Sequence, residues 1–179
     1  YNELAKFVIE KIKEPVRIVD HTFIPSILNE QKLLLIPSGG LSGLSNSKIF
    51  KKKLSEFVKN GGTIVCFTQQ HGYDFNALPT DALKAYGWQE DALCYSKAAY
   101  IENFHQILSS QTELYPDLKL DGYFTDYPDT TTVLLRRSKN LMPAVFMYNF
   151  GKGMVIVTSL YSDWGHINGQ AGLSEINLI

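Results

Sequence analysis

The sequence has little of what would identify several classes of protein. Its 179 residues include only two cysteines, Cys66 and Cys94, too few for a disulfide framework and without the spacing of a zinc finger. No run of about 18 apolar residues is present that could cross a membrane. The 17 basic and 18 acidic residues give a net charge of −1, which favours neither nucleic acid nor an anionic membrane as a partner. We therefore expect neither partner.

The composition is that of an ordinary globular domain. Hydrophobic residues make up 45% of the chain and charged residues 20%. A chain of this length buries roughly 70% of its unfolded surface, which is enough for one hydrophobic core. The sequence opens on Tyr1 and ends within an expected helix at Ile179. We therefore expect residues 1–179 to form a single domain that belongs to a longer protein.

The first seventy residues alternate between helical and strand patterns. Apolar residues at helical spacing predict an amphipathic helix over 3–13, and VRIVD (16–20) is a short strand candidate. The apolar runs KLLLIP (32–37) and TIVCF (63–67) are typical of strands buried on both faces. Between them, 45–60 places Ile49, Phe50, Leu54, Phe57 and Val58 on one helical stripe, which Gly61-Gly62 ends. This alternation favours a parallel α/β sheet.

The remainder of the chain changes character twice. Residues 74–130 are rich in Tyr, Asp and turn signals and are expected to form an inserted lobe. Three strand patterns follow at 131–138, 143–150 and 153–161, joined by short links that favour antiparallel hairpins, and a last helix is expected from about Ala171. The predicted fold is a three-layer, doubly wound α/β domain with a mostly parallel sheet, late antiparallel hairpin strands and an inserted lobe.

Three stretches carry a resemblance to a known superfamily: LLLIPSGG (33–40), FVKNGGTIVCF (57–67) and YNFGKGMVIVTSLYSDWG (148–165). The sequence resembles the class I glutamine amidotransferase-like superfamily, which has a flavodoxin-like sheet. Within it, the chain is similar to trehalose-utilisation-type proteins and to the middle domains of bacterial β-galactosidases. The resemblance implies a strand followed by a sharp turn at the position of TIVCF.

The same resemblance argues against the activity of the superfamily. Active members carry a nucleophilic Cys within G-x-C-x-G on that turn, and a His and Glu as H-x-E after a late strand. Here the turn is Phe67-Thr68-Gln69-Gln70-His71-Gly72, and Cys66 falls too early, inside the strand. The late strand ends in Ser-Leu-Tyr-Ser-Asp (159–163), without H-x-E. We therefore expect no amide hydrolysis.

Polar residues nevertheless follow three of the predicted strands. The carboxyl ends of parallel strands meet at one crevice, where ligands bind in open α/β sheets. The predicted ligand-binding residues are Ser38, Gly39, Gly40, Gln69, Gln70, His71 and Tyr161. His71, Asp163 and His166 are candidates for acid–base chemistry, although each could equally hold a loop in place. They lack metal-binding spacing, and the chain lacks a Walker lysine and a dinucleotide motif, so we expect no metal and no cofactor.

These observations leave three hypotheses. The first is a non-catalytic, amidotransferase-like binding or structural module of a larger bacterial protein, related to carbohydrate and in contact with neighbouring domains of the same chain. The alternative is a hydrolase with a relocated site that uses His71 with Asp163 or His166. The third is a scaffold or oligomerisation domain. An open crevice at the strand ends favours binding, whereas a crevice filled by 74–130 favours the scaffold.

Overall fold

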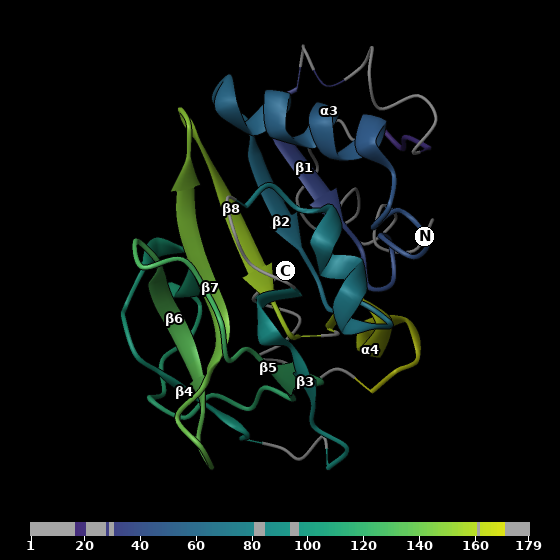
Figure 1. Cartoon of the computed structure of the whole chain (residues 1–179). Helices are drawn as coiled ribbons and strands as arrows, with labels where there is room; N and C mark the ends of the chain where they lie inside the picture. Colours follow the sequence, from purple (N-terminus) through teal and green to yellow (C-terminus); the bar gives the residue numbers. More distant parts are fainter. Residues whose placement is uncertain are drawn as a thin grey trace.

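A computed structural model gives the architecture of residues 17–20, 28, 31–80, 85–93, 97–160 and 162–170 (Figure 1). The expected helices over 3–13 and from Ala171 lie outside these residues. The expected strand over 16–20 does not form in its described part, since residues 17–20 have no regular structure. The elements, in chain order, are β1 (Leu33–Ile36), α3 (Lys48–Lys59), β2 (Thr63–Cys66), η2 (Gly72–Ala77), η3 (Ala85–Gly87), β3 (Gln89–Glu90), β4 (Ala99–Ile101), η4 (Gln106–Leu108), β5 (Gly122–Tyr123), β6 (Thr132–Arg137), β7 (Pro143–Phe150), β8 (Gly153–Thr158) and α4 (Ser162–Ile167).

Six strands form one sheet in the order β1-β2-β8-β7-β6-β4. The pairs β1·β2 and β2·β8 are parallel, and the pairs β8·β7, β7·β6 and β6·β4 are antiparallel. Strands β1, β2, β6 and β8 therefore run in one direction and β7 and β4 in the other. This confirms the α/β class and the antiparallel hairpins at the end of the chain.

Helix α3 follows the sequence pattern closely at its two ends. The Ser47 hydroxyl caps the first turn by accepting a hydrogen bond from the Phe50 N–H at 3.3 Å. After the last helical residue, Gly61 takes a φ of +106°, a conformation that favours glycine. The next residue, Gly62, lies so close to the Phe57 ring that a side chain there would overlap it.

The predicted apolar stripe on α3 is wrong at one residue, Ile49. Phe50, Leu54, Phe57 and Val58 are buried against the sheet, but Ile49 is 72% exposed. Successive helical residues are about 100° apart, so Ile49 points away from the face that Phe50 covers. Strand β1 also differs from its prediction of burial on both faces, because Leu33 at its start is exposed.

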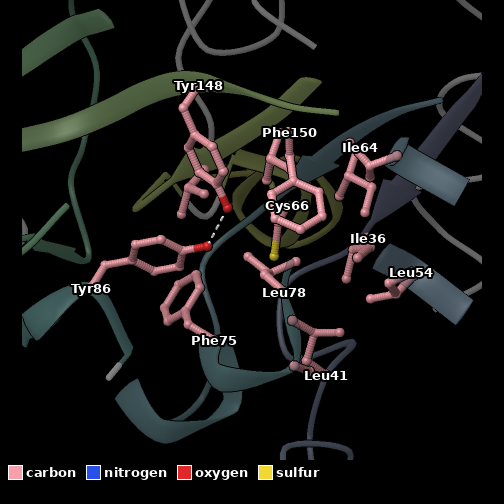
Figure 2. Packing of buried hydrophobic residues seen from close by; sticks show 14 of the residues in the cluster. Ile36, Leu41, Leu54, Ile64, Cys66, Phe75, Leu78, Tyr86, Tyr148 and Phe150 are labelled. Carbon is pink, nitrogen blue, oxygen red and sulfur yellow. Dashed lines mark hydrogen bonds between the residues drawn. The ribbon is translucent and has the colours of Figure 1, made fainter. Parts of the chain in front are cut away.

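Side-chain alternation along the strands builds two hydrophobic clusters, one on each face of the sheet. On the α3 side, Ile64, Cys66, Val155 and Val157 join a cluster that extends to Phe75 and Tyr86 (Figure 2). The opposite face holds a second cluster: Ala98, Ala99, Ile101, Leu108, Leu118, Leu120, Leu134, Leu135, Ala144, Val145, Ile156 and Leu160. The sheet is therefore the middle layer of the domain.

The segment 74–130 is tied to the main sheet at several points. Its strand β4 pairs with β6 and forms one edge of the six-stranded sheet. Strands β3 and β5 pair with each other in a separate two-stranded sheet, which lies beyond the end of β8 in Figure 1. The stretch 105–110 contains only a single 3-10 turn, η4. The segment thus contributes both to the sheet and to the surface near the strand ends.

Candidate functional site at the strand ends

The carboxyl ends of β1, β2 and β8 meet at one edge of the sheet, as the sequence predicted. The Asp163 carboxylate links the loop after β1 to α4, which follows β8. Asp163, at the start of α4, is buried and accepts two hydrogen bonds from Ser38 just after β1. The Ser38 N–H lies 2.8 Å from one carboxylate oxygen and its hydroxyl 2.5 Å from the other. The two residues are 125 positions apart in the chain. This bidentate contact holds the loop after β1 against α4.

Gln69, which follows β2, is almost fully buried, with 1% of its surface exposed. Its amide oxygen accepts a hydrogen bond from the Leu41 N–H at 2.8 Å. Its amide nitrogen donates to the carbonyls of Phe67 at 2.7 Å and Pro37 at 3.2 Å. These partners belong to the loops after β1 and β2, so Gln69 ties the two loops together.

The backbone of the predicted Ser38-Gly39-Gly40 loop is also engaged within the protein. The Gly39 N–H donates to the Thr68 carbonyl at 3.0 Å, and the Gly40 N–H to the Pro37 carbonyl at 2.8 Å. Gly39 has a φ of +71°, which brings its amide to the neighbouring strand end. Both amides therefore support the loop.

Cys66 is the last residue of β2, as the sequence indicated, and lies in the core (Figure 2). Burial raises the pKa of its thiol well above the ordinary value, and a hydrogen bond from Gln69 offsets only part of that effect. A thiolate at this position is strongly disfavoured. Cys66 is thus placed as a core side chain.

The 74–130 segment reaches the strand ends through Asp121. The Thr68 hydroxyl donates a hydrogen bond to the Asp121 carboxylate at 2.6 Å, and the Asp121 N–H donates to the Ser159 carbonyl at 2.9 Å. Burial raises the pKa of the Asp121 carboxyl, the Thr68 hydrogen bond lowers it, and the charge of Glu90 raises it further. The segment therefore packs against the ends of β2 and β8, an arrangement expected of a scaffold, so the binding hypothesis depends on the polar atoms that remain unpartnered there.

The buried polar atoms without a hydrogen-bond partner in the described part of the chain include Ser159 Oγ, whose residue bonds Asp121 through its carbonyl, Trp88 Nε1 beside Gly122, and Asp74 Oδ1 in η2; Thr80, Thr131 and Ser162 each hold one more. The Trp88 ring packs on Gly122, where a methyl group would stand 2.8 Å from Nε1, and its other edge faces Gly72. At the start of η2, the other carboxylate oxygen of Asp74, Oδ2, accepts a hydrogen bond from the His71 N–H at 3.2 Å. We call Thr68, Asp74, Trp88, Asp121 and Ser159 the Asp121 cluster. Buried polar atoms are ordinarily paired, so this cluster marks the strand ends as a place with unmet hydrogen-bonding capacity.

Sequence reasoning missed most of the Asp121 cluster. The sequence pattern placed Asp74, Trp88 and Asp121 in an inserted lobe and gave Thr68 no role in binding. The only local indication of this site was the tripeptide Asp-Gly-Tyr at 121–123. Its glycine permits an aromatic ring to pack closely on the backbone, as the Trp88 ring does on Gly122. Nothing in the local pattern indicated that this segment returns to the strand ends.

The other predicted site residues lie around this edge. Gln70 and His71 are exposed, and the His71 ring stacks on Tyr73 with centroids 5.0 Å apart. Both Asp163 oxygens bind Ser38, whereas the His71 backbone binds Asp74. His166 lies in the last turn of α4. Tyr161 falls outside the described residues. Their roles in ligand binding or acid–base chemistry stay predictions.

The described part of the chain shows neither a metal-binding cluster nor a membrane-spanning helix. No group of three or more His, Cys, Asp or Glu side chains comes together there as a metal site. No helix among those residues has the length and hydropathy needed to span a membrane.

Comparison with known proteins gives structural matches only. No family model matches the sequence, and no curated protein matches it. A cytoplasmic protein from Salmonella typhimurium is similar over 98% of this chain and 82% of its own, with 15% identity and a TM-score of 0.65. PurLQS from Thermotoga maritima is similar over 84% of this chain and 77% of its own, with 12% identity and a TM-score of 0.58.

A third match is a GH42 β-galactosidase from G. stearothermophilus. It is similar over 96% of this chain but only 26% of its own, with 16% identity and a TM-score of 0.52. At such identities these matches show the fold alone. The chain therefore shares the α/β fold of these proteins, which in the GH42 enzyme makes up only part of a longer chain.

Proposed function

We propose that this chain is a non-catalytic module that binds a small neutral polar ligand, such as a sugar, at the carboxyl ends of β2 and β8. The observation that carries the proposal is the set of unpartnered buried atoms in the Asp121 cluster. An unpaired buried polar group costs about 1–3 kcal/mol, so three of them together favour a ligand that pairs with them.

The chemistry of the cluster favours hydroxyl groups in the ligand. The carboxylates of Asp74 and Asp121 accept hydrogen bonds, the Trp88 indole donates one, and the Ser159 hydroxyl does both. Two carboxylates disfavour an anionic ligand by charge repulsion. A sugar offers several hydroxyls that both donate and accept. The structural match to a GH42 β-galactosidase makes galactose a sensible first probe.

The absence of catalysis is inferred from what occupies the strand ends. Cys66 is buried with a raised thiol pKa, and the Ser38 hydroxyl is bound to Asp163. Hydrolysis of an amide needs a nucleophile beside a base that can take its proton. Cys66 does not meet that requirement, and both oxygens of the Asp163 carboxylate beside Ser38 are already engaged in the contact that holds the loop after β1. We further infer that the module works beside other domains of a larger bacterial protein, and the match to 26% of a GH42 chain supports this arrangement.

Isothermal titration calorimetry with galactose, mannose, glucose and trehalose tests the binding proposal. We expect saturable binding of at least one sugar, weakened about tenfold by Ser159→Ala or by Trp88→Phe, since each removes one buried hydrogen bond. Ser55→Ala on α3 is the matched control and leaves binding unchanged. Absence of binding to all four sugars, or equal binding by Ser159→Ala, would overturn the proposal.

An ammonia-release assay with glutamine tests the inference about catalysis separately. We expect no release above the spontaneous rate. Release by the wild-type protein that is lost in Cys66→Ala would show a working amidotransferase nucleophile and contradict the inference.

A further inference from the structure

Lysines gather on α3 and on the turn between β7 and β8. The 12 residues of α3 include five lysines and one glutamate, a net charge of +4 in a chain whose net charge is −1. The β7–β8 turn adds Lys152, whose N–H donates to the Lys59 carbonyl at 3.2 Å. We call this the α3 surface: Lys48, Ile49, Lys51, Lys52, Lys53, Lys59 and Lys152. Helix α3 itself lies above β1 and β2 in Figure 1.

The positive charge of the α3 surface is largely unneutralised. Within the described part of the chain, only Lys52 of these lysines has a carboxylate at ion-pair distance, Glu56 at 3.7 Å, and that pair is exposed. The Lys59 ammonium lies 5.2 Å from the centre of the Phe150 ring instead. Like charges at helical spacing of three or four residues repel one another. An anionic partner would relieve this repulsion.

Ile49 lies in the first turn of α3, next to Lys48, and is 72% exposed. Helical spacing places Lys52 and Lys53, three and four residues later, beside it on the same face. A single exposed isoleucine is ordinary by itself. Next to lysines, however, it adds an apolar contact to a positive surface. A partner that matches both features needs acidic groups and an apolar group.

We infer that the α3 surface docks an acidic protein segment that covers Ile49 with an apolar side chain. Charge complementarity selects an anion, and Ile49 distinguishes a peptide from a nucleic acid. Binding of single-stranded nucleic acid relies on exposed aromatic rings on which bases stack, whereas α3 buries both of its phenylalanines. Membrane insertion needs an apolar helical face, and the apolar face of α3 is packed on the sheet.

This inference is independent of the strand-end ligand site. Lys152 precedes the start of β8, whereas the Asp121 cluster lies at the carboxyl end of that strand. A sugar and an acidic segment would therefore occupy different parts of the domain, and failure of one proposal leaves the other intact.

The test is fluorescence anisotropy with the full chain and a labelled peptide of repeating Glu-Glu-Leu. We expect saturable binding that weakens steeply with added salt. Charge reversal at Lys48, Lys52 and Lys53 to Glu should weaken binding at least about tenfold. Ile49→Ser should weaken it by a smaller factor without changing the salt dependence.

Controls separate the possible partners. Reversal of Lys97, Lys119 and Lys139, which lie outside α3, should leave peptide binding unchanged, and circular dichroism checks that each variant is folded. Oligo-dT and vesicles containing phosphatidylserine are titrated alongside. Tighter binding of either of these than of the peptide, or peptide binding that survives the α3 charge reversal, would overturn the inference.

Discussion

Asp163 accepts hydrogen bonds from both the N–H and the hydroxyl of Ser38, and so links α4 to the end of β1 across 125 residues of sequence. The contact holds the loop after β1 against α4, and an acid–base role for Asp163 stays a prediction. Unpartnered buried polar atoms occur at Ser162, next to Asp163, as well as at the Asp74, Trp88 and Ser159 side chains of the Asp121 cluster.

The Ser38–Asp163 contact predicts a measurable difference between two substitutions. Asp163→Ala removes the acceptor for two donors and should lower the free energy of unfolding by about 2–3 kcal/mol. Ser38→Ala removes only the hydroxyl and should cost about 1 kcal/mol, because the backbone hydrogen bond remains. Urea denaturation measures both. Equal costs would show that the two hydrogen bonds do not act as described.

Gln69 and Gln70 are adjacent glutamines with opposite environments, which makes them a matched pair. Gln69→Leu leaves the Leu41 N–H without its partner and removes the hydrogen bonds from Gln69 to the Phe67 and Pro37 carbonyls, so it should cost about 2 kcal/mol of unfolding free energy. Gln70→Leu changes an exposed side chain and should alter stability by less than about 0.5 kcal/mol. Thermal and urea unfolding of the two variants check this order, and a reversed order would contradict the account of Gln69.

Asp121 should make stability fall as the pH rises. Its folded-state carboxyl pKa is raised above the ordinary 3.8, mainly by burial, so the folded state holds this proton after the unfolded state has released it. Its contribution therefore declines from about pH 3.8 upward until the folded-state pKa is passed. Asp121→Asn should remove this decline, so its stability relative to wild type should increase over that range and then level off.

Two further variants test the cause of this decline. Thr68→Val removes the donor that lowers the Asp121 pKa and should extend the decline to higher pH. Glu90→Gln removes a charge that raises the pKa and should shorten it. Urea denaturation across the pH range follows both, and identical profiles for the two variants would exclude Asp121 as the titrating group.

The buried ion pair between Asp91 and Arg137 should have the opposite effect and make stability fall as the pH is lowered. Its Nε and Oδ2 atoms are 2.5 Å apart, and the hydrogen bond from Arg137 lowers the pKa of the Asp91 carboxyl. Its stabilisation is therefore present above pH 3.8 and is lost as the pH falls through the lower folded-state pKa. Asp91→Asn should cost about 3–5 kcal/mol near neutral pH.

An exposed ion pair provides the comparison for Asp91. Lys97 and Glu113 are 3.4 Å apart at the surface, and Glu113→Gln should cost less than about 1 kcal/mol. A cost for Asp91→Asn no larger than this would show that burial does not strengthen the Asp91–Arg137 pair.

The parts of the fold that could be predicted are those set by local pattern. The apolar runs around Leu34 and Ile64, the Ser47 cap and the glycines after α3 each determine their own element, and β1, α3 and β2 formed as expected. Ile49 was misplaced because its neighbour Phe50 is apolar too, and periodicity cannot separate two adjacent apolar residues at the edge of a helical stripe.

The candidate site was only partly predictable, because its decisive contacts are distant in sequence. The topology placed Ser38, Gln69 and Asp163 at one edge, but not the bond between Ser38 and Asp163 or the burial of Gln69. Asp121 reaches Thr68 across 53 residues from a segment without periodic signal. Contacts of this kind depend on how a loop packs on a finished sheet, which no local pattern determines.

The most direct test of the central claim is nuclear magnetic resonance of the two tryptophan indole N–H groups during titration with galactose, mannose, glucose and trehalose. Trp164→Phe assigns the Trp88 signal, since the chain has two tryptophans. We predict that one sugar moves the Trp88 signal saturably while the spectrum of the sugar itself shows no product. A Trp88 signal unmoved by all four sugars, or conversion of a sugar to product, would contradict the account.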